Sequence, residues 1–488
     1  MALDGVWRGK RIRWSALRAA LAGLLLAPLG SAQADLAFDE VARHWLEAHE
    51  LTLEEAQRAT WSGLLEQRFA HVDLGLFEVF VPREVLADGG SLEEFSQALL
   101  ALLDTQEAWR DWFNGRPVSA HRPEAVVRWI QSWSPSSFAA LDPGGDLASG
   151  LSGESRVPAA LARLREELRS AARLGTEHEL SSARLVLFPE RAAFVEFTCV
   201  AGELDPALQP SAWNAGLTTW LEYDADGTPF LTLEYAARDG ASDYRKGLSV
   251  GYKNEQAPRE LVAQVASRAL LARVFGVGLD PALASAMANT LVIELCGELD
   301  TRIDGDVRAR VTQGRSVFVP GGNPNGGVLP PTSATNRWRG SLGKDHFVGV
   351  LAEVQKLSAT STMDRFERIS CFELVSDDPS TKALVRAPFL GPAAAPPPAA
   401  VWPDYLELVR CYGIAFVHWL RRDAAGTPSG AAQRYAELLR GLARGRATEE
   451  LPALFQEIYA QPLTADSTAA LFASPTLEGR FLTWLSRR

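Results

Sequence analysis

The sequence predicts an α+β protein: a small mixed sheet carries one long helix, a mainly helical region precedes the sheet, and a helical subdomain closes the chain. Three observations predict this class. Apolar residues recur at helical spacing between residues 35 and 180, strand and helix patterns alternate from 181 to 299, and only helical patterns follow residue 403. With 488 residues, 47% hydrophobic and 22% charged, the chain is long enough for two or three domains with buried cores.

Residues 1–34 have the pattern of a secretory signal peptide. A basic stretch precedes the apolar run Ala19–Leu29, and Ala32-Gln33-Ala34 follows as a cleavage site of the A-x-A type. An N-terminal amphipathic helix is the alternative interpretation. No later run reaches the eighteen apolar residues of a membrane span. We therefore expect an exported protein, periplasmic or extracellular, with no integral membrane segment after signal removal.

The charge of the chain excludes one class of partner. Removing residues 1–34 takes five basic side chains and one acidic side chain from a formal net charge of −11, which leaves −15. Nucleic acids and anionic membrane surfaces are bound through basic patches. The sequence therefore favours an unknown peptide or protein as the partner and argues against nucleic acid.

The region from residue 35 to residue 180 is expected to be mainly helical. Helical spacing occurs in residues 39–69, in Leu92–Phe113 and in Pro158–Leu174, whereas Phe77–Val81 alternates as a half-buried strand does. Tryptophans in these patterns are expected in the core rather than on a carbohydrate-binding surface. They are Trp45, Trp61, Trp109, Trp112, Trp129 and Trp133.

Residues 181–299 have the order strand, helix, hairpin, strand, helix. Arg184–Phe188 is strand-like and a short helix follows it; the turn Asp224–Gly227 lies between two further strand patterns, Thr218–Tyr223 and Phe230–Tyr235. A short strand at residues 248–252 leads into a long helix over residues 257–275. Such an order predicts a small sheet with this helix packed on it.

The last two regions differ sharply in composition. Residues 300–402 are rich in Gly, Pro and Asn and end in a Pro-rich tether, which predicts a loop-rich insertion. Residues 403–488 are expected to form helices at Tyr405–Arg421, Ala431–Leu442, Ala447–Tyr459 and Leu477–Leu485.

The four cysteines, Cys199, Cys296, Cys371 and Cys411, contain no C-x-x-C pair. Export permits one or two disulfides, and three full pairings remain open. Cys296 and Cys411 lie in strongly apolar helical patterns, so buried thiols are at least as plausible there.

The order from residue 181 onward resembles the peptidase half of the gluzincin zinc peptidases, as found in peptidase-like domains of exported bacterial proteins. The resemblance covers Arg184–Gly297 and the helical tail Tyr405–Leu485. It rests on the strand and helix of residues 184–195, on Glu260 in a helix that follows a strand, and on Leu279–Leu283, where a second helix begins. The resemblance implies a gluzincin-like fold with a cleft between the sheet subdomain and the C-terminal helices.

The resemblance also implies that the zinc ligands have been lost. Gluzincins carry H-E-x-x-H on the first helix, because His at i and i+4 share one face, and a Glu on the second helix is the third ligand. The matching ligand positions are Arg259, Ala263 and Ser285, and Glu260 keeps the position of the general base. We therefore expect no metal, no cofactor and no zinc-dependent catalysis; Arg259, Glu260 and Ser285 would line a vestigial cleft.

Two other kinds of site compete with this interpretation. The seven histidines offer no convincing ligand set: His44 and His49 are five residues apart, and Ser182 stands where a second His would follow His178-Glu179. The other histidines are His71, His121, His346 and His418. Residues 247–251 fit the G-x-S-x-G pattern of serine hydrolases with Ser249 as nucleophile, but a polar stretch replaces the buried strand that should precede it.

Taken together, the sequence predicts an exported, catalytically inactive metallopeptidase-like protein that binds a peptide or protein or serves as a scaffold. Two alternatives stay open: a hydrolase that uses a site other than zinc, with Ser249 as the candidate, and a purely structural assembly protein.

Overall fold

The computed structural model describes residues 69–119, 121–142, 144–148, 156–176, 180, 182–188, 219–223, 229–234, 257–276, 279, 281–297, 402–445, 451–463, 476–485 and 487. The expected signal peptide, the strand at 248–252, the insertion before residue 402, Cys199 and Cys371 lie outside these residues. So do the first helical segment, at 39–68, and the short helix expected after Phe188.

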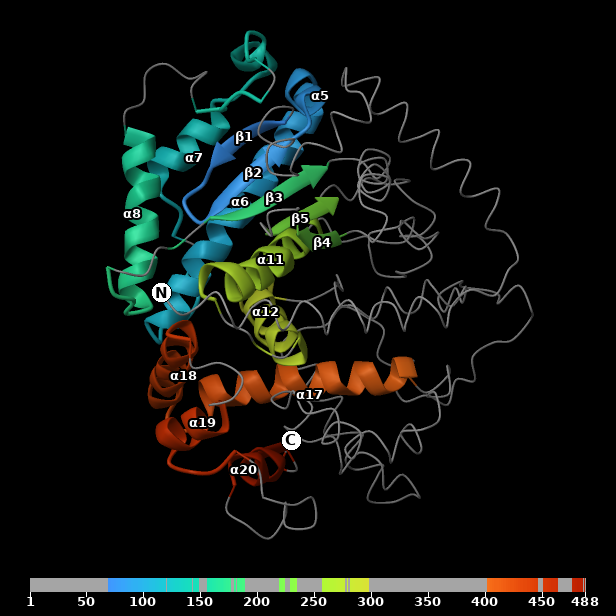
Figure 1. Ribbon diagram of the computed structural model, residues 1–488. Helices are drawn as coiled ribbons and strands as arrows, with labels where there is room; N and C mark the ends of the chain where they lie inside the picture. The colour runs from blue at the N-terminus through green and yellow to red at the C-terminus, as the bar shows by residue number, and fades with distance from the viewer. Residues whose placement is uncertain are drawn as a thin grey trace, which may run out of the picture.

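The described strands form one mixed sheet with the order β1-β2-β3-β5-β4 (Figure 1). The inner pairs β2–β3 and β3–β5 are parallel, and the outer pairs β1–β2 and β4–β5 are antiparallel. The strands are β1 (Ala70–Asp73), β2 (Phe77–Val81), β3 (Ala183–Phe188), β4 (Thr219–Tyr223) and β5 (Pro229–Glu234). The protein is α+β with a small mixed sheet, as predicted, and the predicted hairpin is the antiparallel pair β4–β5.

The centre of the sheet joins two parts of the chain that the sequence analysis separated. In the parallel pairing of β2 with β3, Val79 lies opposite Leu185, and both side chains are fully buried. The boundary expected at residue 180 therefore falls between two neighbouring strands of one sheet. Central parallel strands are typically buried on both faces, which explains the nearly continuous apolar sequence of β2 and β3.

The helix α6 (Gly89–Phe113) is the centre of the helical packing. Asp88 caps its start by accepting a hydrogen bond from the backbone N–H of Ser91 at 2.7 Å. Along most of its length the helix is buried, and it contacts helices from every part of the described chain. Around it lie α5 (Arg83–Ala87), α7 (Glu124–Gln131), the 3₁₀ turn η1 (Pro135–Phe138) and α8 (Arg156–Ala171).

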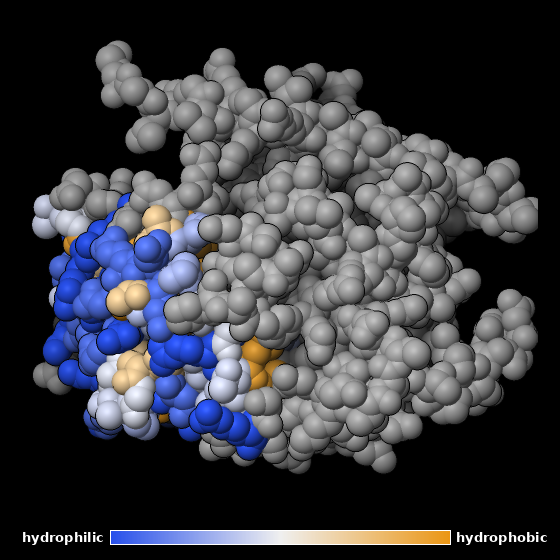
Figure 2. All heavy atoms as spheres, turned by 90° about the horizontal axis from the view of Figure 1, so that it is seen from below, coloured by the Kyte–Doolittle hydropathy of each residue, from blue (hydrophilic) through white to orange (hydrophobic). Residues whose placement is uncertain are grey.

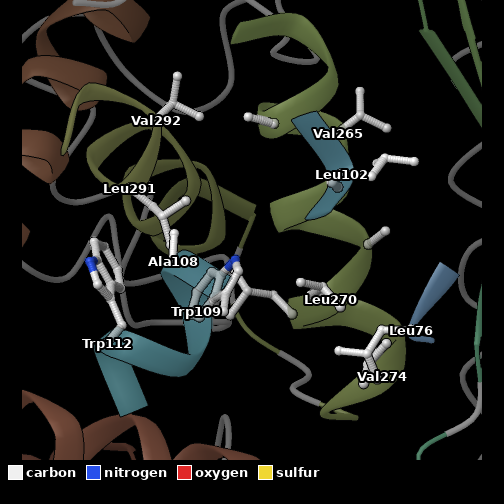
Figure 3. Packing of buried hydrophobic residues seen from close by; sticks show 14 of the residues in the cluster. Leu76, Leu102, Ala108, Trp109, Trp112, Val265, Leu270, Val274, Leu291 and Val292 are labelled. Carbon is white, nitrogen blue, oxygen red and sulfur yellow. The ribbon is translucent and has the colours of Figure 1, made fainter. Parts of the chain in front are cut away.

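The long helix predicted at 257–275 is present as α11 (Ala257–Ala269), which continues into a π-helical turn, η4 (Leu270–Val274). The helix α12 (Pro281–Cys296) begins at a proline, whose missing N–H costs nothing in the first helical turn. α11 packs on both α6 and α12. Figure 3 shows Trp109 and Trp112 of α6 near α11 and α12, with Leu270 and Leu291 beside them.

These two tryptophans are core residues, as the sequence predicted. Both are fully buried, and their rings lie 5.3 Å apart in an edge-to-face arrangement. The indole N–H of Trp109 donates to the hydroxyl of Ser267 on α11 at 3.2 Å, so its only polar group is satisfied. This contact fixes α11 against α6.

The C-terminal subdomain is helical throughout its described part. α17 (Trp402–Arg422) crosses α12 and packs against it, and α18 (Pro428–Ala443), α19 (Leu451–Tyr459) and α20 (Leu477–Leu485) follow (Figure 1). Seen from below, the described surface is mostly hydrophilic (Figure 2). None of the described helices is both long enough and apolar enough to cross a membrane.

Candidate functional site

The residues at the predicted site occupy α11 and α12. Arg259 and Glu260 lie in the first turn of α11, directly after Pro258, and Ala263 follows one turn later. Glu260 and Ala263 are fully buried, whereas the side chain of Arg259 is 30% exposed. Among these residues, therefore, Arg259 is the one that solvent reaches.

The guanidinium of Arg259 is held by an acid from α6. Its Nη2 donates to Oδ2 of Asp104 at 2.9 Å. Asp104 also accepts two hydrogen bonds from Arg122, which lies just before α7: Nε to Oδ1 at 2.5 Å and Nη2 to Oδ2 at 2.7 Å. Asp104 is fully buried, so two arginines from different segments supply the counter-charge for one buried carboxylate.

The surrounding electrostatics follow from this arrangement. The hydrogen bond to Asp104 raises the pKa of Arg122 above its ordinary value, although burial opposes the shift. One turn along α6, burial raises the pKa of Glu107 to about 7, and Asp104 is among the nearby acids that raise it further, while Arg110 acts in the opposite direction. Arg110 also pairs with Glu167 of α8 at 2.7 Å.

Ser285, the third predicted position, lies on α12 in a different environment. It is partly buried, and its hydroxyl accepts a hydrogen bond from the side-chain amide of Asn289 at 3.2 Å. Within the described residues no hydrogen bond joins Ser285 to Arg259. The structure packs α11 against α12 but does not connect these two side chains.

The donor set at the three positions does not fit a zinc ion. Alanine carries no donor atom, the hydroxyl of Ser285 is a weak neutral ligand, and Arg259 brings a positive charge that is already paired with Asp104. Throughout the part of the chain that the structure describes, no group of three His, Cys, Asp or Glu side chains could hold a metal.

The other candidate residues are dispersed or lie beyond the described ranges. Ser249 and the histidines at 44, 49, 178 and 346 fall outside them. His71 lies in β1 with its ring 5.8 Å from that of Phe80, and His418 lies on α17. Cys411 is buried and Cys296 partly buried, in accordance with the apolar patterns around them.

A second charged contact, which the sequence analysis missed, lies between α12 and α17. Arg421 donates to both oxygens of Glu294, at 3.0 and 2.8 Å. The indole N–H of Trp112 donates to the same carboxylate at 2.9 Å, and the guanidinium carbon of Arg421 lies 4.4 Å from the centre of the indole ring. This contact connects α6, α12 and α17.

Two signals in the sequence could have indicated these missed residues. Asp104 and Glu107 follow closely on the apolar run 98–103 of α6, and a charged side chain on a buried helix needs a partner. Glu294 is the one charged residue of α12, and Arg421 follows the apolar stretch of α17 at its last turn. The pattern reveals the need for a counter-charge but not which distant residue supplies it.

Comparisons with models of known protein families, with curated proteins and with solved structures found no match.

Proposed function

We propose that this protein is exported, has a gluzincin-like fold without catalytic activity, and binds a peptide or protein segment beside α11 and α12. The observation that carries the proposal is the state of the first ligand position. Arg259 stands where the first zinc-binding histidine would stand, and it is ion-paired to the buried Asp104. An arginine used in this way offers hydrogen-bond donors to a ligand but no ligand atom to a metal.

The order of the elements supports the proposal. A central strand of a mixed sheet, β3, precedes the hairpin β4–β5; α11 and α12 come next, and a helical subdomain closes the chain. These elements are part of the order on which the resemblance to gluzincins rests; the short helix expected after β3 and the strand expected at 248–252 lie outside the described residues. That order supplies the argument for aligning Arg259, Ala263 and Ser285 with the ligands.

The chemistry at Glu260 also supports a non-catalytic role. In a zinc peptidase this carboxylate takes a proton from a metal-bound water, and the metal lowers the pKa of that water so that it reacts near neutral pH. With arginine and alanine in place of the two histidines, Glu260 has no activated water to deprotonate. Its side chain is fully buried, which suits a structural role at the start of α11.

The first test is the metal content and the peptidase activity of the purified mature protein. We expect no stoichiometric zinc by mass spectrometry and no hydrolysis of a casein or peptide-library substrate, with or without added zinc. Stoichiometric zinc, or zinc-dependent hydrolysis, would overturn the proposal. Labelling of Ser249 by a fluorophosphonate probe would instead support the alternative function, a serine hydrolase with Ser249 as its nucleophile.

A second test asks whether the assigned positions have gluzincin geometry. The triple variant Arg259→His, Ala263→His, Ser285→Glu is expected to gain tight zinc binding, because it restores two imidazoles and one carboxylate. The double variant Arg259→His, Ser285→Glu is the matched control, since it lacks one imidazole. Circular dichroism must show that the triple variant folds, because Ala263 is fully buried. A folded triple variant that binds zinc no better than the double variant contradicts the assigned geometry.

A further inference from the structure

We propose that Arg122 and Arg259 together form a binding site for the carboxylate group of a peptide ligand. The inference rests on the proposed function for the peptide nature of the ligand. It goes further by naming the chemical group that is recognised and the two side chains that recognise it.

The geometry brings three separate segments to one point. Asp104 comes from the buried middle of α6, Arg122 precedes α7, and Arg259 lies in the first turn of α11. The buried carboxylate holds both arginines through hydrogen bonds of 2.5 to 2.9 Å. Both guanidiniums are therefore fixed before a ligand arrives, which lowers the entropic cost of binding.

The charges of these three groups do not balance. Two guanidiniums share one carboxylate, so the cluster of Asp104, Arg122 and Arg259 has an excess of one positive charge. Nearby on α6 and α8, Arg110 is paired with Glu107 and Glu167, and Arg163 is paired with Glu167. The excess of one positive charge belongs to these three groups, with Glu107 one turn away from Asp104 on α6.

The arginines also have donors to spare. A guanidinium carries five N–H donors; Arg122 uses its Nε and Nη2 on Asp104, and Arg259 uses its Nη2, while the Nε of Arg259 is buried and out of reach of a ligand. Within the described residues, the Nη1 groups of both arginines make no hydrogen bond. Both side chains are 30% exposed, whereas the neighbouring Glu260 is fully buried. A ligand that approaches from solvent therefore meets arginine first.

A carboxylate is the group that fits these donors best. Planar guanidiniums bind planar carboxylates through parallel hydrogen bonds, as Arg122 already does with Asp104. The strongly acidic chain repels anions at long range, but salt screens charges beyond about 8 Å at physiological ionic strength. The local excess of positive charge therefore decides which group binds at short range.

The test uses the full mature protein and an array of immobilised hexapeptides. Each sequence is presented as the free C-terminal acid, as the C-terminal amide, and as the amide with one internal Asp. We expect free acids or Asp-containing amides to bind more tightly than the plain amides, and the two arms distinguish a C-terminal carboxylate from a side-chain carboxylate. In Arg259→Gln this preference should fall at least about 10-fold, because a charge-assisted hydrogen bond is lost.

The control variant is Arg128→Gln, which removes an exposed arginine of α7 that is paired only with Glu124. It should leave the preference unchanged. Equal binding of all three peptide forms, or an acid preference that persists in Arg259→Gln, overturns the carboxylate site and leaves peptide binding intact.

A measurement with acetate distinguishes two outcomes: that Arg122 and Arg259 do not bind a carboxylate, and that the protein does not bind peptides. Sodium acetate should raise the melting temperature of the wild type above that in sodium chloride of the same ionic strength, and this difference should vanish in Arg259→Gln. If acetate shows the Arg259-dependent effect but no peptide binds, the site is supported and the proposed peptide binding is wrong. If neither acetate nor any peptide responds to Arg259, the inference is overturned.

Discussion

The helix α6 contributes to two charged junctions, in each of which a carboxylate is paired with arginine. The number of arginines for each carboxylate differs between the two. The open junction consists of Asp104, Arg122 and Arg259, and its two arginines are each 30% exposed. The closed junction consists of Glu294, Arg421 and the indole of Trp112; its carboxylate and guanidinium side chains are 10% and 5% exposed. One junction has an excess cation at the surface, and the other is balanced and buried.

The same kind of ion pair is buried in the closed junction and partly exposed in the open one, where we propose that it also binds a ligand. In the closed junction burial tends to raise the pKa of Glu294, but the charge and hydrogen bonds of Arg421 outweigh burial and hold this pKa below its ordinary value. In the closed junction the guanidinium of Arg421 and the indole N–H of Trp112 both donate to the buried carboxylate of Glu294. In the open junction only the carboxylate of Asp104 is buried. The two arginines are partly exposed, and within the described residues their Nη1 groups make no hydrogen bond.

The largest effect is expected from breaking the closed junction. Arg421→Met should lower the free energy of unfolding by about 3–5 kcal/mol, because it leaves the carboxylate of Glu294 buried without its counter-charge. Urea denaturation followed by tryptophan fluorescence measures this loss. The double variant Glu294→Leu, Arg421→Met should recover much of it, since neither charge then remains. A loss below about 1 kcal/mol in the single variant would show that this junction does not hold the helices together.

The next effect is expected from the carboxylate of the open junction. Asp104→Asn should cost about 2–4 kcal/mol, because two adjacent guanidiniums lose their shared counter-charge while a buried amide replaces it. The matched control is Glu124→Gln, which removes an exposed acid whose pair with Arg128 is expected to contribute less than about 1 kcal/mol. Equal effects in the two variants would contradict the central position of Asp104.

Most of the described helices could be predicted from the sequence, because the pattern that predicts a helix lies within the helix itself. The helices α11 and α17 carry apolar residues at helical spacing, whereas α6 and α12 contain long apolar stretches, and Pro281 marks the start of α12. The pairing of β2 with β3 was not predictable in this way, because it joins residues about a hundred positions apart. Strand patterns reveal which residues are apolar but not which strand lies beside them.

The same limit applies to the candidate site. The resemblance to gluzincins singled out Arg259, but its partner Asp104 lies 155 positions earlier on another helix. Periodicity indicates that α6 is buried and therefore that Asp104 needs a counter-charge; it does not tell which arginine supplies it. Glu294 and Arg421 are 127 positions apart, and the sequence left their pairing undetected for the same reason.

A smaller effect is expected in the pH dependence of stability beside the open junction. Burial raises the pKa of Glu107 to about 7, so the folded state binds a proton there that the unfolded state releases near pH 4.5. Stability from this group is complete below about pH 4.5 and declines as the pH rises to 7. We expect a decline of about 1–2 kcal/mol, which is less than the full shift implies because the structure around a buried carboxylate relaxes and admits water when the group ionises.

Glu107→Gln removes this titration, which has no counterpart in the closed junction because the pKa of Glu294 is lowered there. The variant should show a flatter profile of unfolding free energy between pH 4.5 and 7 than the wild type, measured by urea denaturation at fixed ionic strength. Glu124→Gln is the control, because Glu124 is exposed. A wild-type slope that survives in Glu107→Gln would assign the titration to another group.

The smallest effect on stability is expected from Arg259→Gln. Asp104 keeps both hydrogen bonds from Arg122 in this variant, so its buried charge is still compensated, and the loss should be about 1 kcal/mol or less. Urea denaturation of Arg259→Gln beside Arg421→Met compares one arginine from each junction directly. A loss as large as that of Arg421→Met would mean that Arg259 is as structural as Arg421. A small loss of stability together with a large loss of carboxylate binding would show that Arg259 acts in ligand binding, because the fold is then stable without it and the ligand is not bound without it.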